Sequence, residues 1–143
     1  SDRIVIAVAA MAEYEPPLTL LDLGTATTVS VVDKTGAFRG GAIMPGISSS
    51  LDSLITKASL LPRIRLQAPE KVVGSNTNDC MESGIVFGTA AMIEGMTARI
   101  EEELGYPVTV VGTGGLGRRE IRRDDTLLLE GLRIIYEKNR KAV

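Results

Sequence analysis

The chain has 143 residues, of which 44% are hydrophobic and 24% are charged, and its formal net charge is −2. This size and composition predict a single soluble domain with enough apolar residues for a core. The 16 basic and 18 acidic residues are mixed along the chain, which argues against a nucleic-acid or anionic membrane partner. With one cysteine, Cys80, and no histidine, the chain can form neither an internal disulfide, nor a histidine-based metal site, nor a Ser-His-Asp triad.

The first residues predict a helix that runs from Asp2 to Met11. Asp2 can cap it, and Ile4, Val8 and Met11 share one face. This apolar stretch is too short to span a bilayer and lacks the features of a signal peptide, so we expect a cytoplasmic protein. Because the chain starts at Ser1 with a motif rather than with Met, we also expect that a preceding segment is missing.

Three strands are predicted next, over residues 18–23, 27–32 and 37–43. Each is an apolar or β-branched run, and the turn-forming residues Asp33 to Gly36 join the second to the third. Short connections of this kind favour an antiparallel meander.

The remainder predicts two helices, a strand and a last helix. The first helix spans residues 51–58, with a cap from one of Ser48 to Ser50, and the second spans about 82–104. A short strand over 108–111 and a helix over about 126–139 complete the order βββ-α-α-β-α. This order predicts an α/β domain with a mixed sheet flanked by helices, and it does not fit a doubly wound Rossmann fold.

Two glycine-containing turns at strand ends are the candidate functional segments. In the first, Asp22 to Thr27, Gly24 lets the backbone approach a ligand, and the N–H groups and hydroxyls of Thr25 and Thr27 can point at phosphate oxygens. Asp22 is better placed to hold a cation, since hard cations prefer carboxylate oxygens. The second turn is Gly112 to Gly115. Each turn alone could equally be structural, the first a hairpin with a solvated aspartate and the second a plain strand exit, but together they favour a nucleotide cleft.

Several motifs in this order resemble the type III pantothenate kinases. They are Ser1-Asp2-Arg3, Asp22-Leu23-Gly24-Thr25-Ala26-Thr27, Gly40-Gly41-Ala42-Ile43-Met44-Pro45-Gly46, Gly74-Ser75-Asn76-Thr77, Ser83-Gly84, Thr113-Gly114-Gly115 and Leu129-Glu130-Gly131-Leu132. The resemblance covers nearly the whole chain. It implies an actin-like, ribonuclease H-like ATPase (ASKHA) domain, the second of two domains that close on ATP. It also implies phosphorylation of pantothenate by ATP in the first step of coenzyme A synthesis.

The resemblance assigns roles to individual residues. Asp2 is the implied general base, Ser1, Asp2 and Arg3 belong to a pantothenate-binding motif, and Thr77 contacts pantothenate. Asp22 is implied to hold potassium or ammonium, while Thr25, Gly24, Gly114 and Gly115 contact ATP, which carries Mg²⁺. From the residues alone, Asp2 could be only a helix cap, Arg3 a solvated charge, and Thr77 a cap of the next helix.

Backbone donors, a cation and one carboxylate are sufficient for phosphoryl transfer, because this reaction depends on positioning and charge neutralisation and needs no histidine. The family's other phosphate motif, D-x-G-N, is absent from this chain, so we expect the chain alone to be inactive. Other readings are a related kinase or phosphatase, or a non-catalytic accessory relative with the same fold.

The resemblance also implies a homodimer. The first helix and the helix over 84–104 are the best candidates for the interface, with Gly84, Gly88, Ala91 and Gly95 allowing close approach and Ile93, Met96 and Ile100 offering area to bury.

Overall fold

A computed structural model describes residues 2–57, 69–113 and 119–121, with side-chain burial described for 2–56 and 69–113. Its helices are α1 (Asp2–Met11), α2 (Ile47–Lys57) and α3 (Thr77–Leu104). Its strands are β1 (Leu18–Leu23), β2 (Ala26–Val32), β3 (Phe38–Pro45), β4 (Thr109–Thr113) and β5 (Arg119–Ile121). The helix expected over 126–139 lies outside the described residues.

The strands form one mixed sheet in the order β3-β2-β1-β4-β5. The meander is confirmed, because β1 pairs antiparallel with β2, and β2 antiparallel with β3. β4 lies parallel to β1 on its other side, so the chain crosses over between β3 and β4. β5, which the sequence did not predict, pairs antiparallel with β4. A mixed sheet flanked by helices is therefore the architecture, as predicted.

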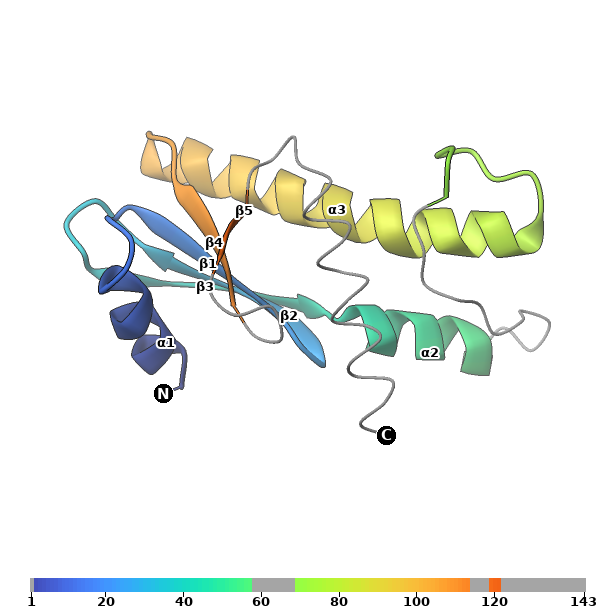
Figure 1. Ribbon diagram of the computed structural model, residues 1–143, viewed down its shortest axis with the longest axis horizontal. Coiled ribbons are helices and arrows are strands. Elements are labelled where there is room, and N and C mark those ends of the chain that lie inside the picture. The colour runs from blue at the N-terminus through green and yellow to red at the C-terminus, as the bar shows by residue number, and fades with distance from the viewer. Residues whose placement is uncertain (1, 58–68, 114–118, 122–143) are drawn as a thin grey trace.

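Helices cover both faces of the sheet (Figure 1). On one face, Ala7 and Ala10 of α1 pack with Leu18 and Leu20 of β1 and with Val32 of β2. The other face carries the larger cluster, in which β1 and β2 residues pack against α2 and α3. Its members are Leu21, Leu23, Val29, Ile47, Leu51, Met81, Ile85, Val86, Ala90, Ile93 and Val110. The continuous apolar run of β1 is thus explained by burial of both of its faces.

The bounds of α1 agree with the prediction, but its buried face does not. Ile4 and Val8, which were expected to share the packed face with Met11, are 47% and 61% exposed. The buried residues are the small ones, Ala7 and Ala10. A helix that lies this close to a sheet needs short side chains at the closest contact, whereas the larger Ile6 and Met11 pack partly buried at its sides.

The starts of α2 and α3 also differ from the prediction. α2 begins at Ile47, so Ser48 to Ser50 lie inside its first turn and do not cap it. α3 begins at Thr77 and not at Glu82, because the side chain of Asn76 accepts a hydrogen bond from the backbone N–H of Asp79 at 2.9 Å. Asn76 is therefore the cap, and Thr77, the alternative weighed from sequence, is the first helical residue.

Candidate functional site

The turn between β1 and β2 holds the first predicted motif. Asp22 lies near the end of β1 and is half-buried, and its neighbours in register are Thr28 on β2 and Thr113 on β4. The buried hydroxyl of Thr113 donates to the carbonyl oxygen of Leu21 at 3.2 Å. The carboxylate of Asp22 thus lies between β2 and β4, each of which places a threonine beside it. The hydroxyl of Thr113 on β4 also ties β4 to β1.

Gly24 and Thr25 form the turn itself. The backbone N–H of Gly24 donates to the carbonyl of Ala26 at 3.1 Å, which closes the turn. Thr25 is exposed, while Thr27 is buried, and its hydroxyl has no hydrogen-bond partner among the described residues. The sequence analysis predicts that both threonine hydroxyls can point at a ligand. Thr25 is accessible to a ligand on the surface, but the buried Thr27 is not.

The start of α2 packs against this turn. The Ser49 hydroxyl donates to the carbonyl oxygen of Thr25 at 3.0 Å. A Cβ atom on Gly46 would lie 2.2 Å from that oxygen and 2.6 Å from the carbonyl oxygen of Gly24. The sequence shows Gly46 as the last residue of a motif shared with the family and Ser49 as one possible helix cap. The missed signal is the pair of a glycine and a hydroxyl at a helix start.

The second predicted glycine turn, Gly112 to Gly115, does not begin at Gly112. Gly112 and Thr113 are strand residues of β4, in register with Leu21 and Asp22. Gly114 and Gly115, the predicted ATP contacts, lie outside the described residues. Because β1 and β4 are parallel neighbours, Asp22 and Thr113 nevertheless reach the same end of the sheet, as a cleft built from both segments requires.

The predicted pantothenate residues lie elsewhere. Asp2 is exposed and Arg3 is half-buried, at the start of α1, while Ser1 lies outside the described residues. Thr77 is exposed in the first turn of α3. The two helix starts lie toward opposite ends of the long axis of the molecule (Figure 1). Within one chain, the structure therefore does not bring Asp2 and Thr77 together.

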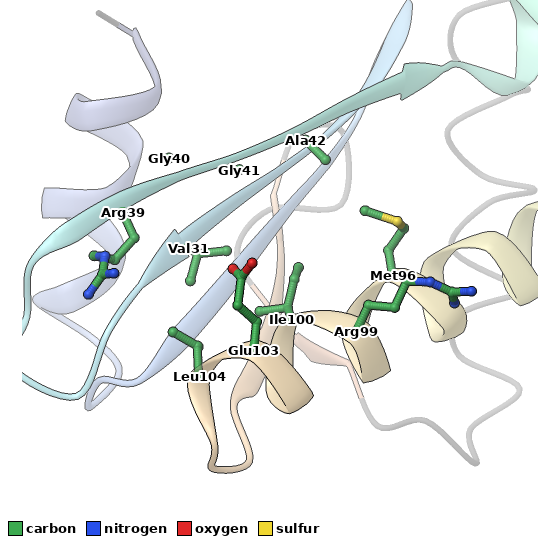
Figure 2. Close-up of a pocket in the computed structure, with 10 residues that line it drawn as sticks. All are labelled: Val31, Arg39, Gly40, Gly41, Ala42, Met96, Arg99, Ile100, Glu103 and Leu104. Atoms are coloured by element: carbon green, nitrogen blue, oxygen red, sulfur yellow. The ribbon is translucent and has the colours of Figure 1, made fainter.

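A cavity of about 300 Å³ lies between the sheet and the C-terminal half of α3 (Figure 2). Its lining consists of Val31 on β2, Arg39, Gly40, Gly41 and Ala42 on β3, and Met96, Arg99, Ile100, Glu103 and Leu104 on α3. Figure 2 shows the carboxylate of Glu103 directed toward the sheet, whereas the guanidinium of Arg99 points away along the helix. None of the predicted site residues that the structure describes lines this cavity.

Within the described ranges, no group of three or more His, Cys, Asp or Glu residues could hold a metal ion. Over the same residues, no helix has the length and apolar character that a bilayer crossing needs. Asp22 is the predicted cation ligand, and the neighbouring threonines are the other side-chain oxygens in register with it.

The sequence of this chain is similar to that of known proteins. Residues 1–99 match the family model described as type III pantothenate kinase. The chain is 46% identical over 147 residues to the type III pantothenate kinase of Rhizorhabdus wittichii, an alignment that covers 96% of this chain and 56% of the relative. The corresponding protein of Brevibacillus brevis is 47% identical over 146 residues, with 97% of this chain and 57% of the relative covered.

The type III pantothenate kinase of Myxococcus xanthus is 44% identical over 146 residues, again with 97% and 57% covered. This chain thus spans somewhat more than half the length of these relatives.

One solved structure has a similar fold. It is a conserved protein of Campylobacter jejuni described as a Baf family transcriptional activator, with a TM-score of 0.53 and 19% identity over 96% of this chain and 64% of that chain. At this identity the likeness bears on the fold alone. The family-model match covers more than half of the chain, and it includes the turn at Asp22 and both helix starts. The chain therefore belongs to the type III pantothenate kinase family.

Proposed function

We propose that the protein containing this chain transfers the γ-phosphate of ATP to pantothenate, giving 4'-phosphopantothenate in the first step of coenzyme A synthesis. The observation that carries the proposal is the 46% and 47% identity, over nearly all of this chain, to proteins named type III pantothenate kinase. The placement of Asp22, Gly24 and Thr25 at one strand end agrees with it, because a phosphate site needs backbone donors and a nearby charge. A protein of this kind would work in the cytoplasm.

We further propose that this chain is the second domain of an ASKHA kinase. The relatives are longer, and this chain covers 56% and 57% of the first two. The part of such a protein that this chain does not cover would supply the other wall of the cleft and its D-x-G-N phosphate motif. The mixed sheet with an antiparallel meander and a parallel fourth strand is compatible with such a domain.

The proposed nucleotide site uses the turn at Gly24 and Thr25 together with Gly114 and Gly115. Asp22 would hold a monovalent cation, potassium or ammonium, and Mg²⁺ would enter with the nucleotide. A singly charged ion suits this place, since Asp22 is a single carboxylate whose neighbours in register are the neutral Thr28 and Thr113. When bound, the cation would supply positive charge beside the phosphates.

The proposed pantothenate site combines Ser1, Asp2 and Arg3 with Thr77, and Asp2 would accept the proton of the attacking hydroxyl. Since α1 and the start of α3 lie apart within one chain (Figure 1), we propose that a second copy contributes one of the two groups. The site would then form at the interface of a homodimer, whose small molecules are pantothenate and ATP. No nucleic acid or membrane has a place in this scheme.

An assay of the full-length protein tests the function. We expect formation of phosphopantothenate from ATP and pantothenate at about 1–100 s⁻¹, as is typical of kinases, and no appreciable turnover by this chain alone. Lack of turnover by the full-length protein, with ATP still bound, would favour the alternative of a non-catalytic relative. Turnover by this chain alone would contradict the need for a second wall of the cleft.

A second experiment addresses the cation. In the full-length protein, Asp22→Ala should remove activation by potassium and raise the KM for ATP, because the charge that holds the ion is lost. The control is Asp52→Ala, which changes an exposed carboxylate on α2. The measurement is the initial rate as a function of potassium concentration. A variant that keeps the wild-type potassium dependence would remove Asp22 from the cation site.

A further inference from the structure

Two residues of α2 and its start, Gly46 and Ser49, touch the backbone of the turn that contains Gly24 and Thr25. The Ser49 hydroxyl binds the carbonyl oxygen of Thr25 at 3.0 Å. Gly46 packs so closely that an added Cβ would overlap this oxygen and the carbonyl oxygen of Gly24, at 2.2 Å and 2.6 Å. Both carbonyl oxygens are therefore turned toward the start of α2.

This contact fixes the direction of two N–H groups. Among the described residues only the Pro16-Pro17 peptide is cis, and in a trans peptide the C=O and the N–H point to opposite sides. The carbonyl of Gly24 shares its peptide with the N–H of Thr25, and the carbonyl of Thr25 shares its peptide with the N–H of Ala26. Both N–H groups must then face away from α2.

We propose that Gly46 and Ser49 are positioning residues that hold the N–H groups of Thr25 and Ala26 toward a bound phosphate. The inference rests on the proposed function, because it names what shapes the nucleotide-binding turn. Two consecutive N–H groups that face one side are a donor arrangement that binds anions. Such donors are effective when they are already oriented before the ligand arrives, since little reorganisation is then needed. In this role neither residue needs to touch the nucleotide.

The geometry explains why glycine and serine occupy these places. Any side chain at Gly46 must displace either α2 or the turn, because the overlapping atoms are backbone and cannot rotate away. At position 49, a side chain needs a hydroxyl on a short stem to reach the Thr25 carbonyl. Ser53, which lies one turn further along α2 and is exposed, has no described contact with the turn.

The test uses the full-length protein and titration calorimetry with ATP, without pantothenate. Ser49→Ala should raise the Kd for ATP about threefold to tenfold, as expected for one lost hydrogen bond that orients a donor. Ser49→Thr, which keeps the hydroxyl, should stay within about twofold of wild type, and so should the control Ser53→Ala. Gly46→Ala should weaken ATP binding at least as much as Ser49→Ala. If Gly46→Ala does not fold, the comparison of Ser49→Ala with Ser49→Thr still tests the positioning role.

Steady-state kinetics separate positioning from general destabilisation. For Ser49→Ala we expect a higher KM for ATP and an unchanged KM for pantothenate. An ATP affinity of Ser49→Ala within twofold of wild type, or a wild-type protein that binds no ATP, would overturn the positioning role. A wild-type protein that binds ATP but does not phosphorylate pantothenate would overturn only the proposed function, because the calorimetric test needs no turnover.

Discussion

At the scale of single residues, Asp33 accepts hydrogen bonds on both of its carboxylate oxygens. Its Oδ1 accepts from the Thr35 hydroxyl at 2.5 Å and from the N–H groups of Thr35 and Ala37 at 2.9 and 3.1 Å. Its Oδ2 pairs with Arg39 at 3.2 Å. The Thr35 hydroxyl contributes most to lowering the pKa of Asp33 to about 2, against an opposing effect of burial, with smaller contributions from the two N–H groups and Arg39.

This shift predicts a dependence of stability on pH. The folded pKa lies below the ordinary value of 3.8, so the unfolded chain binds the proton more readily. The contribution of Asp33 is then fully present above pH 4 and is lost as the pH falls from about 4 to about 2. In Asp33→Asn, urea denaturation should show a lower free energy of unfolding at pH 7 and a shallower fall over that interval.

The control for this experiment is Asp52→Asn, since Asp52 is an exposed carboxylate on α2 away from the hairpin. Its unfolding free energy should follow the wild type through the whole titration. If Asp33→Asn has the wild-type slope between pH 4 and pH 2, the pKa of Asp33 is not lowered in the folded protein.

At the scale of elements, the sequence predicts strands well and helix starts poorly. β1 has the predicted bounds because an apolar run flanked by prolines and a glycine turn leaves few alternatives. The starts of α2 and α3 depend on contacts that propensity does not contain. Gly46 accepts the hydrogen bond from Ser50 at 2.9 Å while it is wedged against the Gly24 turn. Gly74 is packed against the backbone of Asp79 and Cys80.

In the candidate site, too, the residues that are neighbours in sequence could be predicted, and those brought in by tertiary contacts could not. Asp22, Gly24 and Thr25 could be predicted together because they are contiguous, and a strand followed by a tight turn keeps them at one place. The partners Thr113 and Ser49 come from distant parts of the chain and become visible only through pairing of β1 with β4 and packing of α2. Asp2 and Thr77, which the resemblance assigns to one pantothenate site, are separated by the fold of one chain (Figure 1).

At the scale of the whole molecule, the surface of α3 suggests a partner. Gly84, Gly88 and Ala91 are exposed on α3. A Cβ added at Gly84 or Gly88 would meet nothing within 4 Å, so packing within the described chain does not require these glycines. A glycine in the interior of a helix costs about 0.5–1 kcal/mol relative to alanine. A helix that keeps two glycines for which the described residues give no packing reason is expected to need a thin surface for another segment, and we propose a second copy of the chain as that partner.

An interface between two copies would use less of α3 than the sequence predicts. Ile93 is buried in the core of its own chain, and Ile100 packs against the same core, so neither is free to cover a partner. The exposed apolar residues of α1, Ile4, Val5 and Val8, are 47%, 67% and 61% exposed and can supply the area instead. A stable two-fold interface removes on the order of 1,600 Å² from water in total. Because α1 and α3 cover opposite faces of the sheet, they would offer this area from two sides of the chain.

Gly88→Ala gives opposite results for a monomer and for a dimer. In a monomer, alanine should raise the free energy of unfolding by about 0.5–1 kcal/mol, because it only improves an exposed helix position. In a dimer packed through this surface, the added methyl should weaken association, and Gly88→Glu should dissociate the protein or unfold it. Light scattering at micromolar concentration should give the mass of two chains for wild type and for Glu102→Lys, which changes an exposed charge near the end of α3. A wild-type mass of one chain, together with a stabilised Gly88→Ala variant, would show that the glycines of α3 serve no partner.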